Sequence, residues 1–166
     1  MRTISTIGYE GAEVDAFVYT LGAAGVDFVV DIREVAASRR RGFSKNALQQ
    51  HLALADIGYI HFRSLGDPKE GREAMRRGNY QAFLAIYLER LATDAAQSQL
   101  RETIRLASER SIALLCYERD PKECHRKIVA ERIKEQGTFA IRHLGVQSNC
   151  RIVHAKANNG EFVRVR

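Results

Sequence analysis

The segment CYERDPKECHR, which begins at Cys116, concentrates side chains that can take part in chemistry. These are two thiols, a carboxylate, an imidazole and a guanidinium, from Cys116, Cys124, Glu118, His125 and Arg126. A helix N-terminus and neighbouring cations lower the pKa of a thiol, so Cys124 at the start of a helix is a candidate nucleophile. Glu118 is then a candidate general base, and His125 a candidate proton carrier.

The two cysteines also allow other interpretations. Cys124 shares one helical face with Ile128 and Val129, where cysteine often packs as a small apolar residue. Cys116, Cys124 and His125 are three potential metal ligands, but their Cys-x7-Cys-His spacing matches no common zinc signature, so we expect no metal. A disulfide between the two cysteines is not expected in a reducing compartment.

A second pair of charged side chains, Asp31 and Arg33, ends an apolar run. Residues two apart on a strand point to the same side of the sheet. A carboxylate beside a guanidinium can position a hydroxyl and a phosphate, so Asp31 is a second candidate base and Arg33 a candidate anion ligand. Arg39 adds a cation in the next loop, and Tyr9 adds a ring on which a base could stack. The simpler alternative is an ion pair at a strand end.

Short apolar runs alternate along the chain with segments of helical periodicity. Strands are expected near 3–9, 26–33, 59–62, 111–118 and 139–144, and helices near 14–25, 44–58, 80–110 (broken near 93–98) and 121–136. The run at 151–166 has the pattern of a β-hairpin with its turn at Asn159-Gly160. The alternation predicts one α/β domain over residues 1–166, with a mainly parallel, Rossmann-like sheet covered by helices and a C-terminal β-hairpin.

These strands would deliver reactive residues to one edge of the sheet. The first ends at Gly8-Tyr9, the second at Asp31 to Arg33, and the fourth at Cys116 to Glu118. Open α/β sheets bind ligands outside the carboxyl ends of their strands. We therefore expect a site at this edge.

The tetrapeptide Asp-Pro-Lys-Glu occurs twice, at 67–70 and at 120–123. Asp as N-cap, Pro at the first helical position and Glu at the third form a capping-box pattern. The repeat therefore predicts two helix starts of the same kind.

The chain of 166 residues is basic, with a formal net charge of +6. A basic balance favours an anionic partner such as a nucleotide or nucleic acid. Basic residues concentrate at 39–45 and 69–78, which we place in or beside loops. No run reaches the roughly 18 apolar residues of a membrane helix, so no membrane partner is expected. Three cysteines, an odd and low count, indicate a reducing compartment, and the cytoplasm is the expected location.

Four motifs occur in the order TIGYEG, VVDIREVAASRRRGFSKNAL, GYIHFRSLG and LLCYERDPKECHR. Over about residues 3–135 the chain thereby resembles the DUF488 family, small α/β proteins of unknown function. The family pattern matches the following positions: Thr6-Ile7-Gly8, Asp31, Arg33, Ser38, Arg39, Leu65-Gly66, Cys116, Glu118, Cys124, His125 and Arg126. Many relatives have prolines after Asp-x-Arg where this chain has Glu34-Val35-Ala36, which implies a less rigid loop. The resemblance implies a shared site but names no reaction.

The favoured hypothesis is an enzyme, a hydrolase or transferase, that acts on a nucleotide, nucleic acid or other phosphate-bearing substrate. Its expected catalytic residues are Asp31, Glu118, Cys124 and His125. Its expected substrate-binding residues are Gly8, Tyr9, Arg33, Ser38, Arg39, Cys116 and Arg126, with the anion held by Arg33, Arg39 and Arg126. A nucleic-acid-binding module without chemistry and a thiol or metal sensor are the alternatives. The sequence names neither a cofactor nor an oligomeric state.

Overall fold

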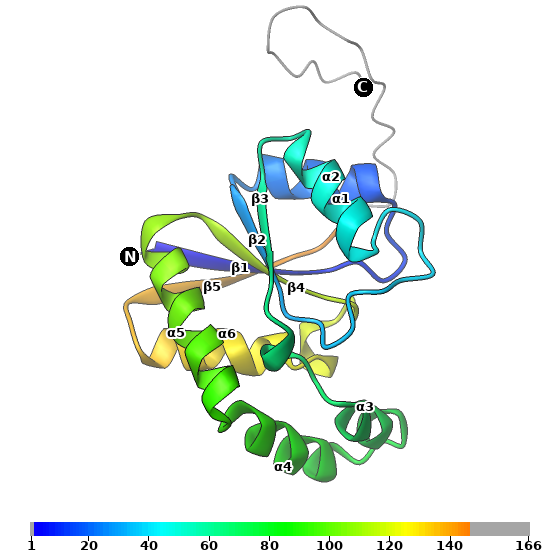
Figure 1. Ribbon diagram of the computed structural model, residues 1–166, viewed down its shortest axis with the longest axis vertical. Coiled ribbons are helices and arrows are strands. Elements are labelled where there is room, and N and C mark those ends of the chain that lie inside the picture. Colours follow the sequence, from blue (N-terminus) through cyan, green and yellow to red (C-terminus); the bar gives the residue numbers. More distant parts are fainter. Residues whose placement is uncertain (1, 147–166) are drawn as a thin grey trace, which may run out of the picture.

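The computed structural model describes residues 2–146 as one α/β domain built on a five-stranded sheet (Figure 1). All strand pairs are parallel, in the order β3-β2-β4-β1-β5. The strands are β1 (Arg2–Gly8), β2 (Phe28–Asp31), β3 (Gly58–His61), β4 (Ile112–Cys116) and β5 (Phe139–Leu144). The predicted parallel α/β architecture is confirmed, whereas the predicted hairpin at 151–166 lies outside the described residues.

Helices cover both faces of this sheet, and each face has its own apolar core. Helices α1 (Val14–Ala23) and α2 (Lys45–Ala53) pack on one face. Helices α5 (Asp94–Glu109) and α6 (Arg126–Glu135) pack on the other (Figure 1). The fully buried strand β4, IALLC, lies between them because parallel strands covered on both faces need apolar side chains on both sides.

A pair of helices, α3 (Lys69–Arg76) and α4 (Tyr80–Leu91), projects from one end of the molecule (Figure 1). The two helices pack against each other, and α4 joins the core through Phe83, Tyr87 and Leu91. The break predicted within 80–110 is confirmed, with Thr93 as N-cap of α5. The basic run 69–78, expected in or beside a loop, forms α3 and the turn after it, so a helix does start at the first Asp-Pro-Lys-Glu sequence, and α3 packs against α4.

The connections that leave β1 and β4 run to opposite faces of the sheet. Helix α1 follows β1 on one face, while α6 follows β4 on the other. Because β1 and β4 are neighbours, their carboxyl ends open a crevice of the kind that holds ligands in doubly wound sheets.

The segment after β4 differs from the continuous helix predicted for 121–136. A short 3-10 helix, η2 (Pro121–Glu123), is followed by Cys124 in an extended conformation, with φ −139° and ψ 140°. Helix α6 begins only at Arg126, and His125 occupies its N-cap position. Cys124 therefore lies in an extended link between two helices and not in a first helical turn.

The two Asp-Pro-Lys-Glu sequences also behave differently. Asp120 accepts a hydrogen bond from the backbone N–H of Lys122 and caps η2 as predicted. In the first copy, Pro68 is the N-cap of α3 and the carboxylate of Asp67 makes no capping bond.

Among the described residues, no helix is long and apolar enough to span a membrane.

Candidate functional site

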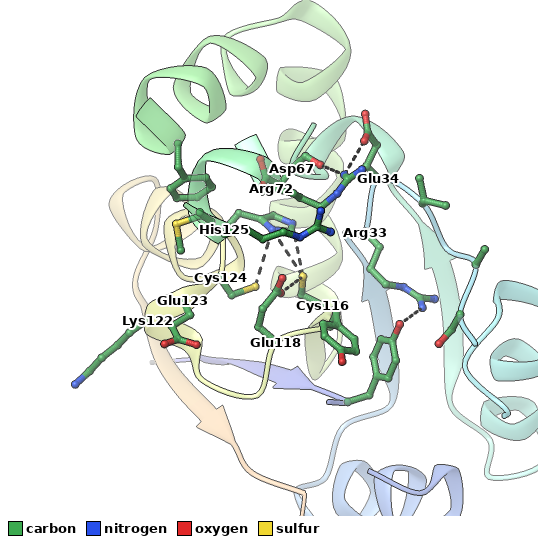
Figure 2. Close-up of a pocket in the computed structure, with 18 of the residues that line it drawn as sticks. Arg33, Glu34, Asp67, Arg72, Cys116, Glu118, Lys122, Glu123, Cys124 and His125 are labelled. Atoms are coloured by element: carbon green, nitrogen blue, oxygen red, sulfur yellow. Dashed lines mark hydrogen bonds and ion pairs between the residues drawn. The ribbon is translucent and has the colours of Figure 1, made fainter. Parts of the chain in front are cut away.

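A pocket of about 1240 Å³ opens at the carboxyl ends of β1, β2 and β4 (Figure 2). The loops after these strands form one part of its wall, and α3 with the start of α4 forms another. Eight of the predicted site residues line it, namely Tyr9, Arg33, Ser38, Arg39, Cys116, Glu118, Cys124 and His125. The other three, Gly8, Asp31 and Arg126, lie behind the lining.

The deep part of the pocket is formed by Cys116, Glu118, Cys124 and His125, which we call the floor cluster. The thiol of Cys116 donates a hydrogen bond to Oε2 of Glu118 at 3.0 Å. Nδ1 of His125 lies 3.7 Å from the sulfur of Cys116 and 3.9 Å from the sulfur of Cys124 (Figure 2). Both cysteines are free, and the two sulfurs and one imidazole nitrogen all lie within 4.8 Å of one another.

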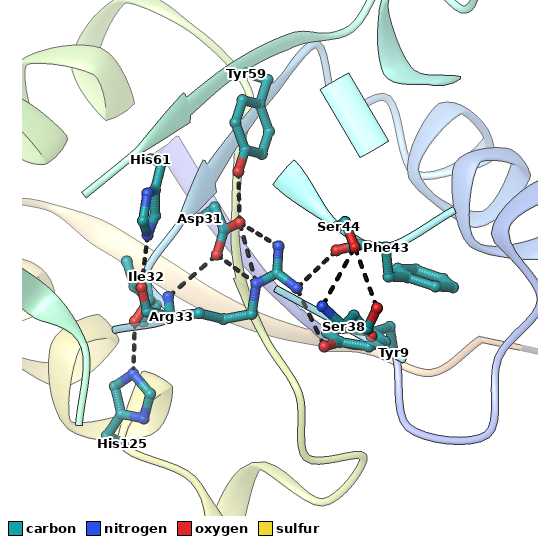
Figure 3. A network of polar contacts seen from close by, with 10 residues as sticks. All are labelled: Tyr9, Asp31, Ile32, Arg33, Ser38, Phe43, Ser44, Tyr59, His61 and His125. Atoms are coloured by element: carbon teal, nitrogen blue, oxygen red, sulfur yellow. Dashed lines mark hydrogen bonds and ion pairs between the residues drawn. The ribbon is translucent and has the colours of Figure 1, made fainter. Parts of the chain in front are cut away.

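The imidazole of His125 is held from behind by the backbone. Its Nε2 lies 2.9 Å from the carbonyl oxygen of Ile32, just after β2 (Figure 3). A carbonyl oxygen only accepts, so Nε2 carries a proton whenever the ring is neutral. Nδ1 then has a free lone pair and is the ring nitrogen nearer to the Cys116 sulfur, which also lies 4.0 Å from Nε2. The ring of Tyr87, 5.2 Å away between centroids, packs against the imidazole and fixes its plane.

The floor cluster shifts the protonation equilibria of its members. Burial raises the pKa of the Cys116 thiol, and burial together with Cys116 raises the pKa of Cys124 well above its usual value. Burial alone would raise the pKa of Glu118, but hydrogen bonds from both thiols outweigh it and lower that pKa. Burial opposes the charged form of His125, yet its interactions with Cys124, Ile32 and Glu118 raise the pKa to about 9.

Asp31 and Arg33 form a buried network beside the pocket (Figure 3). Arg33 Nε donates to both carboxylate oxygens of Asp31 at 2.9 and 3.1 Å, and Arg33 Nη2 donates to Asp31 Oδ2 at 2.6 Å. The first terminal nitrogen donates to the Tyr9 hydroxyl and to the carbonyl of Phe43. Tyr59 donates to the same Asp31 carboxylate at 2.6 Å. Both charges are thus engaged with partners inside the protein.

Arg126 is also buried, with 1% of its surface exposed. Its guanidinium donates to the backbone carbonyls of Glu118 and Arg119, and Nε lies 3.4 Å from the Thr6 hydroxyl. Gly8 lies against the same loop, because an added Cβ would come within 1.8 Å of the Glu118 carbonyl oxygen. These residues fix the backbone that carries Glu118.

Cations and aromatic rings line the exposed mouth of the pocket, with the exposed carboxylate of Glu123 beside them. In the described part of the chain, no carboxylate forms an ion pair with Arg39, Arg76 or Lys122, all three of which are exposed and line the pocket. We call these three residues the mouth cations. Two tyrosines at the mouth, Tyr80 and Tyr117, keep 48% and 47% of their surface exposed.

Sequence reasoning missed the contribution of Asp67 and the helices that follow it. Asp67 lines the pocket, and its Oδ1 is buried without a hydrogen-bond partner. Burial raises the pKa of Asp67 to about 6. The capping-box pattern had assigned this carboxylate to a helix start, but Asp67 is buried and makes no capping bond, whereas Asp120 is exposed and caps η2.

Glu34 and Arg72 were also missed. Arg72 donates to Glu34 Oε2 at 2.8 Å, and Arg90 of α4 lies 3.5 Å from Oε1 (Figure 2). Glu34 therefore ties the loop after β2 to α3 and α4. The loop that lacks the prolines of many relatives is held by ion pairs.

The fold and the pocket define a parallel α/β protein with a polar site at the carboxyl edge of its sheet. Residues 13–133 match the family described as Domain of unknown function DUF488, so the chain belongs to that family. Searches of curated proteins and of solved structures gave no significant match.

Proposed function

We propose that this protein is an enzyme, a hydrolase or transferase, that acts on a nucleotide, a nucleic acid end or another phosphate-bearing substrate in this pocket. The observation that supports it is one cavity with two kinds of lining. Cations without ion-pair partners line its mouth, and thiol, imidazole and carboxylate groups form its floor. The cytoplasm is the proposed location, in keeping with two free cysteines.

The mouth cations are proposed to hold the anionic part of the substrate. Arg39, Arg76 and Lys122 come from three separate segments, so an anion bound among them would be contacted from several sides. Arg33 and Arg126 are proposed to act indirectly, because their donors are already bound to Asp31, Tyr9 and backbone carbonyls. They position the walls and the Glu118 loop.

The floor cluster is proposed to carry the chemistry. Glu118 accepts a hydrogen bond from a thiol and lies where it could accept a proton from a bound hydroxyl or water. His125 lies beside the two sulfurs and contacts the carbonyl oxygen of Ile32, just after β2, so it could carry a proton to or from the thiols. Cys124, whose sulfur lies 3.9 Å from Nδ1 of His125, is still proposed for a covalent step. Its pKa is raised and not lowered as expected for a helix start, so the thiol would have to give its proton to a neighbouring base before it attacks.

Thermal unfolding against a ligand panel tests the binding part of this proposal. The panel contains inorganic phosphate, nucleotides, sugar phosphates and short single- and double-stranded oligonucleotides. A ligand at a hundred times its dissociation constant should stabilise the fold by about 2.7 kcal/mol. We expect Arg39→Ala or Lys122→Ala to weaken that ligand about tenfold, the loss of one charged hydrogen bond.

Matched controls for these variants remove the same charge elsewhere. Arg101 and Lys134 are exposed on α5 and α6 and do not line the pocket. Arg101→Ala and Lys134→Ala should leave ligand affinity unchanged. Equal weakening by both sets of variants would mean that general charge, and not this pocket, binds the ligand.

Turnover of the ligand found in the panel tests the enzyme part. Glu118→Gln keeps the size of the side chain and removes its charge. We expect this variant to retain ligand-induced stabilisation and to lose product formation by at least about a hundredfold, the usual contribution of a general base. Unchanged turnover would exclude Glu118 as the base.

A second candidate, a nucleic-acid-binding module without chemistry, is favoured by the two exposed tyrosines at the mouth. Tyr80 and Tyr117 stand in the same pocket as the mouth cations, and aromatic rings beside cations are typical of single-strand binding. This candidate predicts oligonucleotide affinity that falls steeply with salt and no product. Weak salt dependence together with turnover of a small phosphate would exclude it.

A further inference from the structure

We propose that Cys116, Cys124 and His125 form a binding site for one thiophilic divalent metal ion of the zinc class at the floor of the pocket. The spacing in sequence does not match a common zinc motif, but the extended link at Cys124 brings the three side chains together. The free protein would bind the ion without any substrate. While the ion is bound, Cys124 and His125 act as its ligands, so the covalent and proton-carrying roles proposed above belong to the metal-free protein, whereas the roles of Glu118 and of the mouth cations are compatible with both states.

The distances within the cluster are close to those of a loaded site. Zinc binds thiolate sulfur at about 2.3 Å and imidazole nitrogen at about 2.0–2.1 Å, so tetrahedral angles place sulfur and nitrogen about 3.6 Å apart. Here Nδ1 of His125 lies 3.7 Å from the Cys116 sulfur and 3.9 Å from the Cys124 sulfur. Small side-chain rotations would therefore be enough to coordinate an ion.

The orientation of His125 is that of a metal ligand. Its Nε2 lies 2.9 Å from the Ile32 carbonyl, which leaves Nδ1 free to bind an ion. The Cys124 sulfur lies 3.9 Å from Nδ1, whereas the Cys116 sulfur lies 3.7 Å from Nδ1 and 4.0 Å from Nε2 and would have to rotate toward Nδ1. Metal-binding histidines usually donate their second N–H to a carbonyl or carboxylate in this way. The backbone N–H of Arg126 lies 3.5 Å from the Cys124 sulfur and would stabilise a thiolate there.

The charge and burial of the three residues suit a divalent cation. They are 3%, 5% and 5% exposed, so an isolated charge on any of them would be poorly solvated. Two thiolates and a neutral imidazole would balance the two positive charges of the ion, and the buried floor would gain no net charge.

Three protein ligands would leave the fourth position of a tetrahedral ion available. The three residues line the pocket together with Glu118, so this position can face the pocket and admit a water molecule or a ligand atom. An open fourth position distinguishes catalytic zinc sites from closed structural ones.

Titration of the reduced, metal-free full chain with Co²⁺ tests the proposal. Cys150→Ser serves as the background, so that Cys116 and Cys124 are the remaining thiols of the chain. We expect one bound ion with a sulfur-to-cobalt charge-transfer band and the intense visible bands of tetrahedral cobalt, both abolished by Zn²⁺. Cys116→Ser, Cys124→Ser or His125→Asn should each weaken Co²⁺ binding more than tenfold, whereas His143→Asn, outside the cluster, should not.

A second measurement does not depend on whether the variants fold. In the Cys150→Ser chain, bound Zn²⁺ should slow alkylation of both thiols by iodoacetamide at least tenfold, and a chelator should restore the rate. Equal alkylation rates with and without Zn²⁺, or Co²⁺ binding without a sulfur charge-transfer band, would overturn the proposal. A protein that passes this test but shows no phosphate-dependent stabilisation would retain the metal site and lose the proposed substrate class.

Discussion

Arg33 illustrates how a single residue can be placed near a site and still not face the ligand. Its guanidinium donates to Asp31 through Nε and one terminal nitrogen, and to Tyr9 and Phe43 through the other. A planar fork with its donors engaged in this way has little capacity left for a phosphate. Arg33 is best described as a positioning residue that connects the ends of β1 and β2 to the loop before α2.

Removal of Arg33 is therefore expected to affect stability first. In Arg33→Ala the carboxylate of Asp31, fully buried, loses its charged partner, and such a loss destabilises a fold by about 3–5 kcal/mol. Arg33→Lys should rescue little, because an ammonium cannot replace the bidentate geometry. Urea unfolding of the two variants measures their free energies of unfolding. Arg105→Ala, which breaks an exposed ion-pair network on α5, should cause little change, and a mild effect of Arg33→Ala would contradict the proposed role.

Asp67 should make stability depend on pH. Burial raises its pKa to about 6 in the folded state, above the usual 3.8. The folded protein then binds this proton more tightly than the unfolded chain, so the stabilisation is complete below about pH 4 and is lost as the pH rises to about 6. Relative to the wild type, Asp67→Asn should gain on the order of 1 kcal/mol at pH 7, after allowance for solvent screening, and little at pH 4. Chemical unfolding at the two pH values gives this difference directly; an equal effect at both would refute it.

At the level of secondary-structure elements, the carboxyl end of β1 sets the position of the loop after β4. Gly8 pairs with Cys116 in the sheet and lies directly against the carbonyl of Glu118. Arg126 of α6 donates a hydrogen bond to that same carbonyl. Strand β1, through Gly8, and helix α6, through the guanidinium of Arg126, thus hold the backbone of Glu118, although neither residue lines the pocket.

A methyl group at position 8 should disturb this arrangement. In Gly8→Ala the Cβ would lie 1.8 Å from a backbone oxygen and 3.1 Å from Arg126, so the backbone must shift. We expect a loss of about 3 kcal/mol in the free energy of unfolding. Gly22→Ala in α1, where an added Cβ meets nothing within 4 Å, should instead stabilise by about 0.5–1 kcal/mol. Equilibrium unfolding of the pair provides the comparison.

The elements differ in how far their sequence determines them. The apolar runs that became β2 and β4 were predictable, because a parallel strand buried on both faces must be apolar throughout. For α3 the Asp-Pro-Lys-Glu pattern predicted the start but not the extent, since its residues are mostly polar and lack a clear apolar face, and it packs against α4. The convergence of strand ends correctly anticipated the floor cluster's position. The extended backbone at Cys124 and the missing capping bond of Asp67 were not predictable. Both depend on tertiary packing, which the local sequence pattern does not encode.

At the scale of the whole molecule, the mouth cations have no ion-pair partners among the described residues, whereas the buried charged side chains there have hydrogen-bond or ion-pair partners, with the exception of Oδ1 of Asp67. The Asp31–Arg33 pair is buried, and Glu34 pairs with Arg72 at the pocket wall. The mouth cations contribute to the net charge of +6 without ion-pair partners in the described ranges of the chain. Salt screens exposed charges much more than buried ones, so the two groups should respond differently to ionic strength.

Salt titration should separate stability from binding. Between roughly 50 and 500 mM NaCl the free protein should keep nearly the same unfolding temperature, because the Asp31–Arg33 ion pair is buried and therefore little screened by salt. Over the same range, stabilisation by inorganic pyrophosphate, a compact polyanion, should diminish strongly. The midpoint shift measured with and without pyrophosphate at each salt concentration reports both effects. A salt-independent shift would place the anion away from the exposed mouth.

The helical pair α3–α4 and the floor cluster come from separate stretches of the chain, 69–91 and 116–125. Arg76 and Tyr80 shape the entrance from the first stretch, whereas Cys116, Glu118 and His125 belong to the second. Substitutions confined to Arg76 and Tyr80 can therefore alter which molecules enter, whereas Tyr87 in the same helical pair packs against His125 and must be kept. The specificity of the pocket could thus be retuned at these two surface positions while the buried face of the helical pair, and with it the chemistry, stays unchanged.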